Sequence, residues 1–176
     1  MIQLSTMMWV LALFFAIAGW VRGWNKELIA TAGIVLALFA LFQFDTLLRG
    51  TLLAGVDRDQ VFFVQIGIFI AIVFFAYQTR ALIGERRGSA ENLQESLLGA
   101  ILGFVNGYLI WGSIWYFLDI NEYPWTGWFT APAPGSPSDN AIGLLPLVVF
   151  GGGTNGTGDF LAVAVVVMFV IVLVMI

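Results

Sequence analysis

The chain has 176 residues, of which 60% are hydrophobic and only 10% are charged. Soluble domains carry about 25% charged residues, so this composition predicts an integral membrane protein. The net charge of −4 and the seven basic residues exclude a nucleic-acid binder that relies on a large basic surface. The sequence contains no Cys and no His, which excludes disulfides, thiolate nucleophiles and histidine ligands for metals or cofactors.

Five apolar segments approach the length of about 20 residues that a helix needs to cross a bilayer. They cover residues 5–21, 28–44, 61–78, 96–118 and 160–176. We therefore predict an all-α bundle of about five transmembrane helices in one membrane domain, residues 1–176. No Lys or Arg precedes the first segment, so we expect a membrane span there and not a cleaved signal peptide.

The basic residues predict the orientation of the bundle in the inner (cytoplasmic) membrane. Arg22 and Lys26 lie in the first connection, and residues 79–94 hold three more arginines, which together are five of the seven basic residues. Because basic loops remain in the cytoplasm, we expect both connections there, with the N-terminus outside and the C-terminus inside. The connection formed by residues 119–159 has no basic residue and is predicted to be a long outer loop.

The connections carry further local signals. Residues 45–60 have an apolar middle, which predicts a short amphipathic helix at the outer interface. Ser89 is a typical N-cap for a short cytoplasmic helix that leads into the fourth span. Residues 142–150 are apolar but too short to span, so they either dip into the outer leaflet or pack on the bundle.

The outer loop is rich in aromatic residues. Trp125, Trp128 and Phe129 are typical of a belt at the membrane–water interface, and the alternative is a surface that docks a protein partner.

The fourth span carries a stripe of small and polar residues. Gly99, Gly103 and Gly107 fall within an arc of about 80° in helical projection, which favours close approach of another helix. The polar residues within about 40° of Gly99 are Glu95, Asn106 and Ser113. This flank predicts helix packing, and the alternative is a polar lining for a pathway or a bound ligand.

The second span offers a partner for this stripe. Ala30, Gly33, Ala37 and Ala40 recur at three- and four-residue steps, so we predict that their face meets the Gly99–Gly107 face. Gln65 is the polar residue inside the third span, where it bonds in the bundle interior or lies near the outer interface.

The first connection forms a compact cytoplasmic turn of Arg22, Lys26 and Glu27. Glu27 is expected to complement the N-terminus of the second helix, while Arg22 and Lys26 pair with lipid phosphates or with Glu27. Topology and capping explain these residues, and a specific site is the alternative.

No constellation in the sequence predicts catalysis. There is no carboxylate relay inside a span, no phosphate-binding loop and no nucleophile–base set. We therefore expect a protein that is not an enzyme and that holds no metal or cofactor. A pore is disfavoured because the spans have little polar content.

Two segments resemble the colicin V production protein family. The first is the turn from Gly19 to Leu28, with its Arg22-Gly23 pair and its Lys26-Glu27 pair. The second runs from Leu97 through Gly103 to Gly107. The chain has Glu95-Ser96 and Asn106 where the family usually carries more charge.

The resemblance, which covers residues 9–117, implies a small inner-membrane protein linked to export of a peptide toxin and to envelope maintenance, without enzymatic activity. The alternative function is an accessory subunit docked on a larger respiratory or photosynthetic membrane complex. Both functions imply contact with the lipid bilayer and with protein partners in the membrane.

Overall fold

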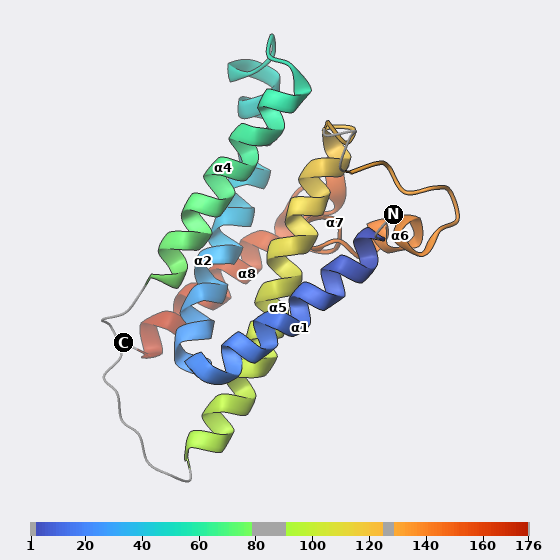
Figure 1. Cartoon of the computed structure of the whole chain (residues 1–176). Helices are drawn as coiled ribbons and strands as arrows, with labels where there is room; N and C mark the ends of the chain where they lie inside the picture. The colour runs from blue at the N-terminus through green and yellow to red at the C-terminus, as the bar shows by residue number, and fades with distance from the viewer. Residues whose placement is uncertain (1–2, 79–90, 125–128, 176) are drawn as a thin grey trace.

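The computed structural model describes residues 3–78, 91–124 and 129–175 (Figure 1). All regular structure in these ranges is helical. Four helices are long and apolar enough to cross a membrane, and they coincide with the first four predicted spans. They are α1 (Leu4–Arg22), α2 (Trp24–Gln43), α4 (Arg58–Tyr77) and α5 (Glu91–Ile120).

The fifth predicted span, residues 160–176, coincides with a helix that is shorter than the other four. Helix α8 (Asp159–Met175) has 17 residues, and its apolar part falls below the length of the four candidate spans. At a rise of 1.5 Å per residue it is about 26 Å long, against about 30 Å for the hydrocarbon core. Four candidate spans are thus present by length and composition, and a fifth stays a prediction.

A single glycine joins α1 to α2. Gly23 has a φ of 82°, and its N–H bonds the carbonyl of Gly19 at 2.9 Å. Side chains rarely adopt this φ, so glycine is the residue that permits such an abrupt turn. The two helices separate from this turn, and α5 lies alongside α1 (Figure 1).

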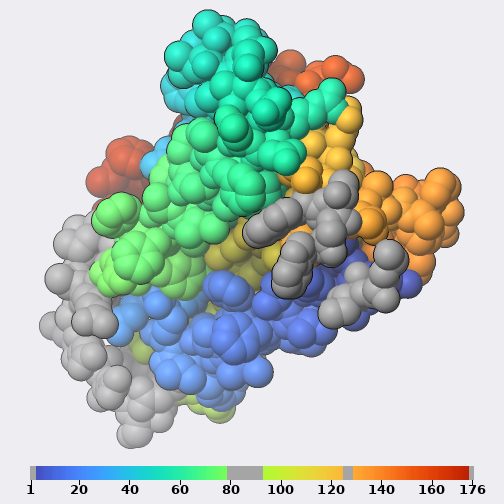
Figure 2. Space-filling model, turned by 45° about the horizontal axis from the view of Figure 1, so that its top comes forward, coloured from blue at the N-terminus to red at the C-terminus, as the bar shows by residue number. Residues whose placement is uncertain are grey.

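The interior of the bundle is apolar and centred on α5. Trp115 of this helix is fully buried, as are Met8 of α1, Leu38 of α2 and Phe69 of α4. The outer faces are also apolar, since Phe14 and similar large side chains of α1 and α4 are exposed. Figure 2 shows α1 and α4 together on one such face. A surface of this kind is typical of helices that face lipid.

Short helices fill the connections. Residues 45–52 form α3 (Asp45–Leu47) and the π-helix η1 (Leu48–Leu52), where an amphipathic helix was expected. The long connection after α5 contains α6 (Pro137–Ala141), η2 (Ile142–Leu144), α7 (Pro146–Val149) and η3 (Gly153–Asn155).

Residues 142–150 pack on the bundle, which was one of the two alternatives. Leu145 and Leu147 are buried, and Pro146 lies so close to Gly112 of α5 that a methyl group there would overlap its ring. The hydroxyl of Tyr108, one turn earlier in α5, donates to the carbonyl of Leu144.

The ends of the bundle are distinct. Figure 1 places the α1–α2 turn and the C-terminus at one end and the N-terminus with α6 at the other. The predicted orientation requires this separation, because it assigns the turn and the C-terminus to the cytoplasm. The orientation itself stays a prediction.

Candidate functional site

The glycine stripe of α5 packs against α1. A methyl group on Gly103 would overlap the carbonyl oxygen of Phe15 and lie 3.0 Å from the Cα of Gly19. On Gly107 it would lie 2.7 Å from the Cα of Ala12. The two backbones therefore touch along this line, as small residues permit.

The predicted pairing of this stripe with α2 is wrong. Gly99 faces Gly19 and Gly23, so the partner is the end of α1 and the turn that follows it. The small residues of α2 serve other neighbours: a methyl group on Gly33 would overlap the Cβ of Ala76 in α4, and Ala30 and Ala37 are fully buried. A small-residue pattern marks a close contact without identifying the helix that makes it.

Helix α2 reaches α5 through polar side chains. Asn106 is fully buried and donates from Nδ2 to Glu27 Oε2 at 2.8 Å and to the Glu27 carbonyl at 3.1 Å. The Thr31 hydroxyl lies 2.7 Å from Asn106 Oδ1 and 2.8 Å from the Glu27 carbonyl. Its single proton serves one acceptor at a time. These bonds satisfy the amide in a place where water is excluded.

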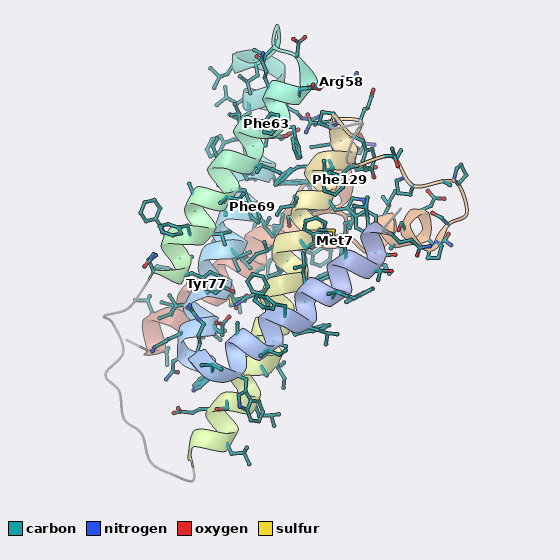
Figure 3. All side chains as sticks on the ribbon, viewed as in Figure 1. Met7, Arg58, Phe63, Phe69, Tyr77 and Phe129 are labelled. Atoms are coloured by element: carbon teal, nitrogen blue, oxygen red, sulfur yellow. The ribbon has the colours of Figure 1, made fainter. Side chains whose placement is uncertain are left out.

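The Glu27 carboxylate is also held from α1 and α4. Arg22 Nε lies 2.6 Å from Glu27 Oε1, and the Glu27 side chain is only 1% exposed. The Tyr77 hydroxyl donates to Glu27 Oε2 at 3.3 Å. Figure 3 shows Tyr77 near the end of α4, next to the start of α2.

Arg22 is fixed by Tyr77 as well as by Glu27. Its guanidinium carbon lies 4.5 Å from the centre of the Tyr77 ring, a cation–π geometry. Its Nη2 lies 3.4 Å from the Tyr77 carbonyl. The side chain is 30% exposed, so the cation reaches the edge of the bundle while the carboxylate stays inside.

We name these five residues, Arg22, Glu27, Thr31, Tyr77 and Asn106, the Glu27 cluster. They come from α1, α2, α4 and α5, so every candidate span contributes a side chain around the buried Glu27 carboxylate. Removing one partner of a buried ion pair costs about 3–5 kcal/mol, because an uncompensated charge remains. The cluster thus connects the four helices through side-chain contacts.

Sequence reasoning found parts of this cluster. Arg22, Glu27 and Asn106 were singled out, and the Arg22–Glu27 pairing was one of two alternatives. The burial of Glu27 was not expected, because the residue was assigned to capping at the cytoplasmic surface. Thr31 and Tyr77 were not identified. The available signal was the spacing of Glu27 and Thr31, which puts them on one helix face.

The other residues of the predicted stripe lie outside the cluster. Ser113 is fully buried, and its hydroxyl bonds no described residue. Glu95 is half-buried and forms no ion pair within the described ranges. Lys26 of the turn is half-buried and is likewise unpaired with any described carboxylate.

A second polar cluster lies at the opposite end of the bundle. Gln65 is 1% exposed, accepts from Asn121 Nδ2 at 2.8 Å and donates to Asp45 Oδ1 at 3.1 Å. Arg49 binds both carboxylate oxygens of Asp45, at 2.7 and 2.6 Å. The hydrogen bond with Asp45 raises the pKa of Arg49 further above its usual value. The first alternative for Gln65 is therefore confirmed, since it is buried and bonds inside the bundle, and a position near the outer interface stays a prediction.

The end of α5 is tied down by a third set of bonds. Trp115 Nε1 donates to the Tyr123 hydroxyl at 3.1 Å, and that hydroxyl donates to Asp119 Oδ1 at 3.0 Å. Burial raises the pKa of Tyr123 well above its usual value. Glu122 and Tyr123 have φ values of 59° and 53°, a conformation that non-glycine residues adopt at a cost.

The aromatic docking surface is only partly described. Phe129 packs on Trp111 of α5 at 6.5 Å between ring centres (Figure 3), so it faces the bundle. Trp125 and Trp128 lie outside the described residues, as does the predicted N-cap Ser89.

The Glu27 carboxylate of the cluster is buried and has a partner at each oxygen. One oxygen of Glu27 meets the guanidinium and the other accepts from Asn106 and Tyr77. Within the described ranges no three acidic side chains gather in a way that would hold a metal ion. The arrangement suits a polar lock between helices.

These features define a helical protein whose described residues include four candidate membrane spans that meet at the Glu27 cluster. The chain belongs to the colicin V production protein family, whose model matches residues 4–132. The match includes all five residues of the Glu27 cluster and confirms the resemblance noted from the sequence. Helices α6, α7 and α8 follow the matched segment. Neither the curated proteins nor the solved structures include a significant match to this chain.

The two segments that carry the family resemblance meet in space. The turn brings Gly19, Gly23 and Glu27, and the later segment brings Gly99 and Asn106. The glycines form the contact between backbones, and the Glu27–Asn106 bonds lie beside it. The motif residues therefore build one joint structure, although about 80 residues of chain separate them.

Proposed function

We propose that this chain is a non-enzymatic protein of the bacterial inner membrane that acts in export or envelope maintenance. Membership of the colicin V production protein family supports the assignment to that role. The observation that supports the non-enzymatic part is the burial of Glu27, whose carboxylate is contacted from three other helices. A general base must come within hydrogen-bond reach of a substrate proton, and this carboxylate is 1% exposed and surrounded by side chains of its own chain.

In this proposal the Glu27 cluster holds the spans in one fixed arrangement on which export or maintenance depends. The test is complementation of cells from which the gene has been removed. We expect the wild-type chain to restore peptide toxin export or resistance to detergents. Arg22→Gln should fail to restore either, and the lipid-facing control Ala71→Phe should succeed, because Ala71 is exposed. If wild-type chain inserts at normal levels and restores neither phenotype, the proposed role is wrong.

The orientation is testable by cysteine labelling, because the natural sequence contains no Cys. We expect Thr130→Cys, in the outer connection, to react with a membrane-impermeant maleimide in intact cells. Asn25→Cys, in the α1–α2 turn, should react only after the cells are opened. The reverse pattern would invert the proposed orientation.

The accessory-subunit role has less support. It depends on outer aromatic residues that are free to dock, and Phe129 packs on Trp111 of the same chain. Purification in mild detergent followed by native sizing tests this role, which predicts a stoichiometric partner chain.

A further inference from the structure

An apolar groove of about 280 Å³ lies between α2, α4 and α8. It faces outward from the bundle, because Leu36 and Phe169 on its walls are exposed. The residues that shape it include Ile29, Ala32, Gly33, Ala76, Val165 and Phe169.

The groove is hollow where its α2 and α4 walls carry small residues, between Ile29 and Leu36 of α2. Gly33 and Ala76 bring α2 and α4 into contact, and Ala32 beside them adds only a methyl group. The longer side chains of α8, such as Val165 and Phe169, form the other wall. The result is an apolar groove whose α2 wall extends from Ile29 to Leu36.

The groove ends near a cation. Ala76 lies in the last turn of α4 and Ile29 in the second turn of α2, so both are at the end of the bundle that carries the α1–α2 turn. Lys26 precedes Ile29 by three residues and Gly33 by seven, which places it on the groove face of α2, about one turn beyond the groove.

Lys26 differs from its neighbour Arg22 in its pairing. Arg22 is neutralised by Glu27, whereas no described carboxylate pairs with Lys26. A lysine at the end of a span extends its ammonium group to the level of the lipid headgroups. Lys26 therefore supplies a positive charge at the place where a chain lying in the groove would meet its headgroup.

We propose that the groove binds one anionic phospholipid, with an acyl chain along Ala32 and Gly33 and the phosphate at Lys26. Basic pockets between spans on the cytoplasmic side recognise anionic headgroups in this way. Charge complementarity favours phosphatidylglycerol over phosphatidylcholine, since the choline ammonium repels Lys26. This site is separate from the Glu27 cluster and does not depend on the proposed function.

The test is native mass spectrometry of the full chain in a mild detergent with equal amounts of phosphatidylglycerol and phosphatidylcholine. We expect one retained lipid, predominantly phosphatidylglycerol. Lys26→Gln should reduce the preference about fivefold, since a basic residue near the surface contributes about that factor to anionic lipid binding. Ala32→Phe should remove the retained lipid, because its ring fills the groove from a half-exposed position. Ala71→Phe and Arg58→Gln are the controls, as neither residue lines the groove.

Three outcomes would overturn the proposal. The first is equal retention of the two lipids by the wild-type chain. The second is a lipid that stays bound to Ala32→Phe. The third is a co-purifying protein, in place of a lipid, that Ala32→Phe displaces. Each variant is compared at equal melting temperature and elution volume. If Ala32→Phe unfolds, Leu36→Trp fills the same groove from an exposed position and decides the question.

Discussion

The Arg22–Glu27 ion pair should behave as one energetic unit. Arg22→Gln removes the cation that lies 2.6 Å from Glu27 Oε1 and leaves a carboxylate that is 1% exposed. Loss of one partner of a buried pair costs about 3–5 kcal/mol. Since Asn106 and Tyr77 still donate to the other oxygen, we expect a loss at the low end, about 3 kcal/mol of unfolding free energy.

The matching change at Glu27 should cost less. Glu27→Gln leaves the guanidinium of Arg22, which is 30% exposed and remains partly solvated. We expect a loss of about 1–2 kcal/mol, because the amide still fits among the same donors but no longer pairs with the cation. The double variant has no uncompensated charge, so its loss should be about 2 kcal/mol smaller than the sum of the single losses.

The assay is unfolding of the purified chain in mixed micelles with increasing dodecyl sulfate, followed by helical circular dichroism. Arg58→Gln is the control, because Arg58 and its partner Glu122 are 61% and 70% exposed. This exposed pair should contribute less than about 1 kcal/mol. If the Arg22 and Glu27 changes add within about 0.5 kcal/mol, the two groups are independent and the pair does not join the helices.

Three further changes test the packing and the backbone. Gly103→Leu should lower the melting temperature in detergent and the unfolding free energy by about 3 kcal/mol or more, because the side chain forces α1 from α5. The control Gly67→Leu points into open space and should change little. Equal melting temperatures of the two variants would contradict the close contact. Asn106→Leu should cost about 1–2 kcal/mol in the same dodecyl sulfate titration, because two bonds to Glu27 disappear, and an unchanged midpoint would mean that those bonds add nothing. Glu122→Gly relieves a φ of 59° and also removes the exposed ion pair with Arg58, so it is compared with Arg58→Gln, which removes the pair alone; we expect Glu122→Gly to be the more stable of the two by up to about 1 kcal/mol, and equal or lower stability would refute the strain.

The spans and the small-residue faces were accessible from the sequence because local signals encode them. Hydropathy over about 20 residues marks a span wherever its partners lie. The spacing of Gly99, Gly103 and Gly107 marks a face of close approach for the same reason. The partner was missed because two helices carry small residues at this spacing. Ala12, Ala16 and Gly19 of α1 form a stripe as Ala30 to Ala40 of α2 do, and local spacing does not decide which of the two faces α5.

The Glu27 cluster could not be predicted from the sequence, for a different physical reason. Glu27 lies three residues inside α2, where a carboxylate usually faces water and complements the helix N-terminus. Its burial depends on Asn106 and Tyr77, which arrive from α5 and α4. No local pattern around Glu27 encodes those neighbours. A polar residue in the middle of an apolar span, as Asn106 is, was the signal that another polar group lies opposite.

The distance along the chain between the partners of Glu27 has a consequence for biosynthesis. Arg22 is five residues away and emerges from the ribosome with Glu27, whereas Asn106 follows 79 residues later. At about 5–20 residues per second, the α1–α2 hairpin waits roughly 4–16 s for α5. During that interval the carboxylate already has its cation, so the hairpin enters the membrane without a net charge at the pair. Asn106 is the last partner of the carboxylate to be synthesised, so we expect the Glu27 cluster to be complete only after α5 has been made.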